Sequence, residues 1–249
     1  MSRNLAAALA LLLLLLCAAH TAQAQQLPGV TLRLSQDAAP GEVVPTLQIV
    51  GLMTLMALAP ALILMMTSFT RIVVVLHFLR QAMGTNQVPP AQLVIGLALI
   101  LTFFVMQPTL NAVNETALRP YMEKQIDQKT ALQNAAQPFK DFMLRQVREK
   151  DLALFVNLSG QSKPENMADI GLAVLVPAFV ISELRISFQI GFVLYLPFLI
   201  IDMVVSSVLL AMGMMMLPPV MISLPFKILL FVMADGWYLL VESLVKSFH

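Results

Sequence analysis

Apolar residues along this chain fall into long blocks separated by short polar stretches. The blocks occupy Leu47–Met66, Leu93–Val113, Ile170–Val180 with Ile186–Leu217, and Val220–Val245. A block of about 20 apolar residues is long enough to cross a bilayer as a helix. The pattern therefore predicts an all-α fold of integral membrane-type helical hairpins.

The first two blocks form the first predicted hairpin, within residues 47–113. Pro89 and Pro90 stop the chain just before the second of these blocks. The connecting segment carries Arg71, His77 and Arg80. Positive charge in a connection favours the cytoplasmic side, so we expect this segment inside the cell and the preceding chain outside.

The N-terminal residues have the pattern of a secretory signal peptide. Arg3 precedes the apolar run Leu5–Ala19, and Ala22-Gln23-Ala24 provides small residues at a cleavage site. We expect residues 1–24 to be a cleaved signal peptide, with an uncleaved first membrane helix as the alternative. Residues 25–46 contain Pro and Gly among polar residues and are predicted to form an extended arm.

Residues 114–169 differ from the rest because they carry eight Lys/Arg and eight Asp/Glu side chains. We expect a small, charged, helical domain on the periplasmic side. Apolar residues at helical spacing predict an amphipathic helix over Pro138–Val156. Phe142 and Phe155 lie on its apolar face, which either packs inside this domain or contacts another subunit.

Residues 170–249 form the second predicted hairpin, which contains few charges. Ionisable side chains at membrane depth are costly unless they are paired or reach water. We therefore expect ion pairs between helices or subunits, with Glu183 and Lys227 as the main candidates. Five charged side chains lie between residues 170 and 240, namely Glu183, Arg185, Asp202, Lys227 and Asp235.

Prolines in the second hairpin are expected to break or kink its helices. The four positions are Pro197, Pro218, Pro219 and Pro225. The segment before Pro218 reads Met212-Gly213-Met214-Met215-Met216-Leu217. Flexible, polarizable methionine side chains suit a soft constriction in a channel, but ordinary lipid-facing or core methionines are the commoner explanation.

Composition narrows the range of functions. The 249 residues are 59% hydrophobic and 12% charged, which argues against a water-soluble enzyme. The net charge of +1 provides no basic field for nucleic acid, and the one cysteine, Cys17, excludes a disulfide framework. No catalytic, cofactor-binding or metal-binding motif occurs. Asp202 and Asp235 match an intramembrane aspartyl protease only loosely, so we expect no enzyme and no cofactor.

Several long strings in the chain resemble the flagellar biosynthetic protein FliP family. The resemblance runs from about residue 47 to the C-terminus. It rests on residues 66–72 (MTSFTRI), 79–85 (LRQAMGT), 88–90 (VPP), 142–146 (FMLRQ), 148–152 (REKDL), 177–184 (PAFVISEL), 200–202 (IID) and 214–219 (MMMLPP).

This resemblance implies a core subunit of the flagellar type III export gate, located in the inner membrane and on the periplasmic side of the basal body. Members assemble as a pentamer with FliQ and FliR, next to other export-apparatus membrane proteins, into a helical channel for unfolded flagellar substrates. The family's methionine gasket maps onto Met214, Met215 and Met216. A related SctR-type subunit serves virulence injectisomes, which is the alternative, and a small-solute secondary transporter is a more distant one.

Overall fold

The structure is a computed structural model that describes residues 40–85, 89–160, 166–214 and 217–248. Its helices are α2 (Pro40–Met65), α3 (Phe69–Ala82), α4 (Ala91–Val113), α5 (Arg119–Met122), α6 (Gln128–Gln146), α7 (Glu149–Leu158), α8 (Leu172–Ala211), α9 (Pro219–Met233) and α10 (Gly236–Lys246). A π-helical turn, η1 (Asn114–Leu118), joins α4 to α5, and a 3₁₀ turn, η2 (Met167–Asp169), precedes α8. The described residues contain no strand, so the predicted all-α class is confirmed.

The chain divides into two compact units, Met1–Leu55 and Met56–His249, and the packing of α3 to α10 lies within the second. The predicted signal peptide and residues 25–39 of the predicted arm lie outside the described residues. Residues 40–46, which were expected to be extended, are the first two turns of α2.

Three helical stretches are long and apolar enough to cross a membrane: Gln48–Met65, Ala91–Met122 and Leu172–Ala211. The second joins α4, η1 and α5. The pair α9 and α10 also meets the length and composition test when taken together, but it is bent by 64° at the break. These stretches fit an all-α membrane protein, as the apolar blocks predicted.

Helix α3 corrects the prediction for the segment between the first two apolar blocks. That segment was expected to be a charged cytoplasmic connection, yet α3 lies in the centre of the unit. Ile72, Val75 and Leu79 are at most 2% exposed, and α3 packs along α8 and against α4. Its charged residues misled the prediction, because Arg71 is buried instead of facing water.

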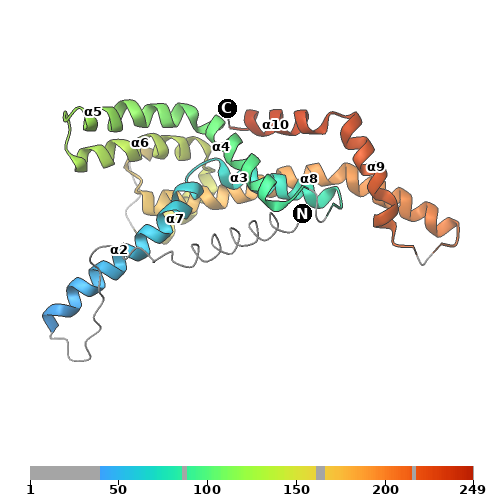
Figure 1. Ribbon diagram of the computed structural model, residues 1–249, viewed down its shortest axis with the longest axis horizontal. Helices are drawn as coiled ribbons and strands as arrows, with labels where there is room; N and C mark the ends of the chain where they lie inside the picture. Colours follow the sequence, from blue (N-terminus) through green and yellow to red (C-terminus); the bar gives the residue numbers. More distant parts are fainter. Residues whose placement is uncertain (1–39, 86–88, 161–165, 215–216, 249) are drawn as a thin grey trace, which may run out of the picture. The chain divides into compact units, whose positions relative to one another are not determined.

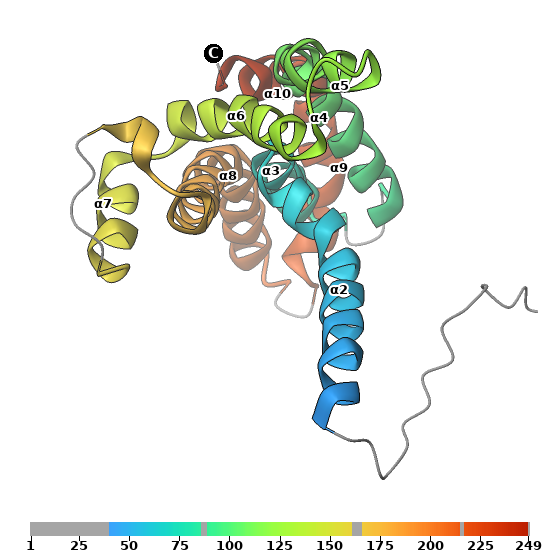
Figure 2. The same ribbon diagram turned by 90° about the vertical axis from the view of Figure 1, so that its left-hand side faces the viewer.

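Helix α8 forms the other half of the core. The charges at residues 182–185 were expected to separate two apolar segments, but α8 runs without interruption over 40 residues. Helices α3, α6 and α7 all pack on it, and Figure 2 shows them around α8, which is seen there nearly end-on. The buried side chains of α3, α6, α7 and α8 form one apolar cluster.

The charged middle segment is therefore part of this core and is not packed as a separate domain. Its predicted helix Pro138–Val156 is two helices. α6 starts ten residues before Pro138, after Asp127, whose carboxylate accepts a hydrogen bond from the Thr130 amide at 3.2 Å. α6 ends because Val147 and Arg148 adopt extended backbone angles, and α7 begins at Glu149.

The prolines of the second hairpin interrupt the helices at only one place. Helix α8 continues through Pro197 and α9 continues through Pro225, so the predicted breaks there are wrong. Proline removes one hydrogen bond but fixes φ at a helical value, so surrounding packing can hold the helix together. Pro218 and Pro219 do lie at a break, between α8 and α9, and Pro219 is the first residue of α9.

Candidate functional site

Arg71 is the centre of a buried polar network that joins four parts of the fold. Its Nε donates to Glu183 Oε2 at 2.8 Å and its Nη2 donates to Glu183 Oε1 at 2.5 Å. Its Nη1 donates to the carbonyl and the hydroxyl of Ser247, at 2.7 and 3.0 Å. Nη2 also donates to Gln146 Oε1 at 3.1 Å. The network thus ties α3 to α6, to α8 and to the residues that follow α10.

The burial of this ion pair explains its geometry. The side chains of Arg71 and Glu183 are 2% and 0% exposed, so water cannot solvate either charge. A buried charge is tolerated when it is paired and its remaining donors are satisfied. A guanidinium binds a carboxylate through two parallel hydrogen bonds, and its other donors are taken by Ser247 and Gln146. The Phe248 ring also lies 3.9 Å from the Arg71 guanidinium carbon.

A second ion pair joins α8 to α9. Lys227 Nζ lies 2.5 Å from Asp202 Oδ2, and the Ser223 hydroxyl donates to Asp202 Oδ1, also at 2.5 Å. Lys227 Nζ further donates to the Ala82 carbonyl at 3.3 Å, at the end of α3. The Lys227 side chain is 3% exposed but that of Asp202 is 29% exposed. Asp202 is therefore accessible from outside the chain, unlike either member of the pair at Arg71.

The structure places the predicted charged residues in two separate networks. Glu183 and Lys227, which were expected to be paired, each have a different partner, Arg71 and Asp202 respectively. Arg185 is exposed and forms no ion pair with any residue that the structure describes. Asp235 is also exposed. The side chain of Asp202 is hydrogen-bonded to Lys227 and Ser223, whereas an aspartyl protease would require Asp202 and Asp235 to act as a pair.

The methionine-rich segment connects α8 to α9. Met212 and Met214 are 62% and 43% exposed, and the Met214 amide donates to the Leu209 carbonyl at the end of α8. Gly213 has a φ of 74°, which turns the chain out of the helix. Met215 and Met216 lie outside the described residues. The methionine gasket stays a prediction, with Met214 exposed to contacts from outside the chain.

Phe142 and Phe155 were the candidates for a periplasmic subunit contact. Phe142 is 4% exposed, and its ring packs edge-on against Phe179 and stacks with Phe248. Phe155 is partly buried against the same core. The Phe142 side chain is thus occupied within this chain, which corrects that prediction in favour of internal packing.

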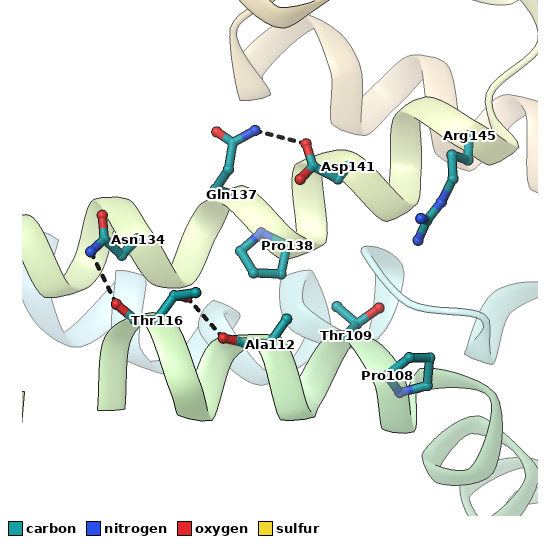
Figure 3. Close-up of a pocket in the computed structure, with 9 residues that line it drawn as sticks. All are labelled: Pro108, Thr109, Ala112, Thr116, Asn134, Gln137, Pro138, Asp141 and Arg145. Atoms are coloured by element: carbon teal, nitrogen blue, oxygen red, sulfur yellow. Dashed lines mark hydrogen bonds between the residues drawn. The ribbon is translucent and has the colours of Figure 1, made fainter. Parts of the chain in front are cut away.

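A pocket of about 580 Å³ lies between α4, η1 and α6. Figure 3 shows Asn134 reaching from α6 to the Thr116 carbonyl, a hydrogen bond of 3.0 Å, and Gln137 donating to Asp141 at 2.7 Å. Pro108 and Pro138 line it from facing helices. Within the described parts of the chain, no group of three or more His, Cys, Asp or Glu side chains is placed to hold a metal ion.

The sequence reasoning missed Arg71 and Ser223 as members of the charge networks. Arg71 was used as a topology signal because positive charges beside apolar blocks often lie in cytoplasmic loops. A signal for its real role was present, since Ile72–Leu76 is an uninterrupted apolar run directly after Arg71. A charge next to such a run either reaches water at the end of the apolar block or needs a buried partner. Ser223 gave no signal of its own.

Comparisons with known proteins give a consistent result. Residues 52–244 match the model of the FliP family. A flagellar biosynthetic protein FliP from Bacillus subtilis (strain 168) is 56% identical over 209 residues, which cover 84% of this chain and 95% of that relative. A protein of the same name from Caulobacter vibrioides (strain ATCC 19089 / CIP 103742 / CB 15) is 49% identical over 244 residues, covering 98% of this chain and 91% of the relative.

Proposed function

This chain belongs to the FliP family, and from that premise we propose that it is a core subunit of the flagellar type III protein export gate. The observation that carries the proposal is the match over residues 52–244, which includes α3 to α9 and most of α10. The named relatives are flagellar biosynthetic proteins. Their names favour flagellar export over the injectisome alternative.

We assign the subunit a structural role in a channel and no catalytic reaction. The channel would be a homo-oligomer, a pentamer by family resemblance, with FliQ and FliR as partners and unfolded flagellar proteins as the cargo. Its place would be the inner membrane and the periplasmic side of the basal body. Helices α8 and α9 support this role because they expose many large apolar side chains, including Phe192, Met203 and Phe226. Extended apolar surfaces of this kind mark contacts with lipid or with other proteins.

The seal of the channel would be formed by Met214, Met215 and Met216. Methionine side chains are flexible and polarizable, so a ring of them can close around a changing cargo. An apolar constriction also blocks ions by excluding water. The described end of this segment fits the role, because Met214 is exposed at the tip of the α8–α9 hairpin instead of packed in the core.

Replacing Met214, Met215 and Met216 together by Ala tests the gasket. We expect the gate complex to assemble in normal amounts but to leak ions under an imposed gradient, measured by the decay of a membrane potential in cells or proteoliposomes. The matched control replaces Met203, Met221 and Met233, which are 63%, 70% and 78% exposed on α8 and α9, and should not leak. An assembled triple variant that stays tight would contradict the gasket.

The composition of the purified complex separates the gate from a transporter. A gate subunit extracted in mild detergent should run as a multimer that contains unlike membrane subunits, measured by native mass spectrometry with identification of every subunit. A secondary transporter for small solutes would be a monomer or dimer of this chain alone. Recovery of such a self-sufficient species from flagellated cells would overturn the export-gate proposal.

A further inference from the structure

Helices α9 and α10 and the two residues after them are attached to the core at both ends. This segment, residues 219–248, is named the strap here. Figure 1 shows α10 turning away from α9 at the break between them. Within α9, Lys227 holds one end of the strap to Asp202 of α8 and to the Ala82 carbonyl of α3. After α10, Ser247 and Phe248 hold the other end to Arg71.

The second attachment is extensive for two residues that follow a helix. The Ser247 carbonyl and hydroxyl both accept from Arg71 Nη1. The Phe248 carbonyl accepts from Gln146 Nε2 at 3.0 Å. The Phe248 ring lies over the Arg71 guanidinium, stacks with Phe142 and is 8% exposed. These residues thus fill a site made by α3 and α6.

Between the two attachments the strap has a strained bend. Asp235 has φ 48° and ψ 49°, a left-handed conformation that non-glycine residues adopt at a cost in energy. No side-chain hydrogen bond caps α10 there. A Cβ at Gly236 would overlap the Phe231 ring, so the bend leaves no room for a larger residue. Phe231 and Trp237 meet edge to face across the bend at 5.4 Å.

A straight helix over α9 and α10 would be the alternative conformation of this segment. Together α9 and α10 meet the length and composition test for one membrane-spanning helix. In a straight helix Asp235 would adopt right-handed helical angles, so its backbone strain would disappear. Strained residues persist when the surrounding structure holds them in place. The bend is therefore held by the attachments at its two ends and by Leu240 and Leu244 of α10, which are 6% and 1% exposed in the apolar core.

The two attachments differ in what their release would leave behind. Releasing Lys227 would separate two opposite charges, one of which is buried. Releasing Ser247 and Phe248 would leave the Arg71–Glu183 ion pair intact, because the strap contributes only neutral groups there. Separating the charges would leave Lys227 buried without a counter-ion. At the other end water can replace the neutral acceptors, and the further cost there is exposure of Phe248, Leu240 and Leu244. The Arg71 end is accordingly the end that opens.

We propose that the strap is a conformational latch, in which docking of Ser247 and Phe248 on Arg71 holds α10 bent back and their release lets it swing about Asp235–Gly236. The Lys227 end stays fixed, so α9 keeps its attachment to α8 while α10 moves. The consequence for transport rests on the proposed function, because α9 begins directly after the methionine-rich segment. Opening of the latch would then change how far the α8–α9 hairpin, which carries the seal, can move.

Distances between spin labels on the purified full chain test the latch. The natural Cys17 is replaced by Ala, and cysteines for labelling replace Ser243 of α10 and Arg185 of α8, both exposed. With Phe248 present we expect one narrow distance distribution. Phe248→Ala should add a longer-distance population of roughly 10% or more, the upper end of an ordinary minor state. Phe248→Leu, which keeps apolar bulk but removes the aromatic face, should add less.

Two controls decide what a broadened distribution means. A second label pair, on Arg185 and on the exposed Met221 of α9, should not change, because Lys227 still holds α9. Lys246→Ala removes only the surface pair with Glu242 and should leave both distributions narrow. A distribution unchanged by both Phe248 variants would overturn the latch, and so would equal broadening of both label pairs. Neither result depends on export, so the ion-leak measurement judges the gate independently.

Discussion

The two halves of α8 are both largely apolar but have different surroundings. In the half from Leu172 to Gly191, eight residues are buried. In the half from Phe192 to Ala211, only Phe198 and Leu209 are buried. The buried half is also the one with more charge, since it contains Glu183 and Arg185 against Asp202 alone in the other.

This difference shows that hydropathy does not tell which part of a membrane-type helix is interior. The first half can hold Glu183 because α3 supplies Arg71, and Ser182 because α7 supplies a carboxylate, while the Ser187 hydroxyl donates to the Glu183 carbonyl within α8. Ser182, for example, donates to Asp151 of α7 at 2.8 Å. The second half has few such partners within the chain and presents its apolar residues outward. Contacts with lipid and other subunits are expected to cover it.

The sharpest test of this comparison replaces one phenylalanine in each half. Phe179 is 0% exposed and Phe192 is 65% exposed. Phe179→Ala leaves a cavity in the core and should lower the free energy of unfolding of the chain by about 3–5 kcal/mol. Phe192→Ala should change it by less than about 0.5 kcal/mol. Denaturant unfolding in detergent measures both.

The same two variants should differ in their effect on assembly of the multisubunit complex. Phe192→Ala is expected to lower the yield of the multisubunit complex while the isolated chain stays as stable as before. Equal losses of stability for the two variants would break the distinction between a core half and a contact half.

The ion pairs give a test of similar size. Arg71→Met leaves Glu183 as an unpaired buried charge, which should lower the free energy of unfolding by about 3–5 kcal/mol. Lys227→Met should be milder, because Asp202 is 29% exposed and keeps the hydrogen bond from the Ser223 hydroxyl. Combining Arg71→Met with Glu183→Leu should recover most of the loss, as measured by thermal unfolding in detergent. A double variant as unstable as Arg71→Met would argue against charge burial as the cause.

The sequence allowed the fold class, the apolar blocks and the importance of the charged residues to be predicted. It did not allow the pairing of those charges, because Glu183 and Lys227 have partners 112 and 25 residues away in the chain, Arg71 and Asp202. Local pattern carries no information about contacts at such separations. Phe142 was ambiguous for a related reason, since an apolar face looks the same whether its own chain or another subunit covers it.

Gly191 lies where the buried half of α8 ends, and replacing it should have a smaller effect on the free energy of unfolding. A Cβ at this position would come within 2.5 Å of Cδ2 and 2.6 Å of Cγ of Phe78 on α3. Gly191→Ala should therefore force α3 and α8 apart and lower the free energy of unfolding by about 1–3 kcal/mol. Gly96→Ala in α4 is the matched control, because nothing lies within 4 Å of its Cβ. That change should stabilise the chain by about 0.5–1 kcal/mol through helix propensity.

The smallest expected effect on stability is at the start of α6, the helix that packs on the buried half of α8. Hydrogen bonds from the Thr130 hydroxyl and amide lower the pKa of the exposed Asp127, the residue before α6. A lowered pKa in the folded chain means that the ionised cap stabilises above the unfolded pKa of about 3.9, and that this contribution is lost as pH falls through the folded value.

Asp127→Ala should therefore lower the Tm slightly at pH 7, and the difference from the parent should shrink at pH 3. Asp127→Asn keeps a neutral cap acceptor, so its Tm should be closer to the parent's at pH 7. If the Tm difference between Asp127→Ala and the parent stayed constant from pH 7 to pH 3, the charge of Asp127 would contribute nothing to the stability of α6.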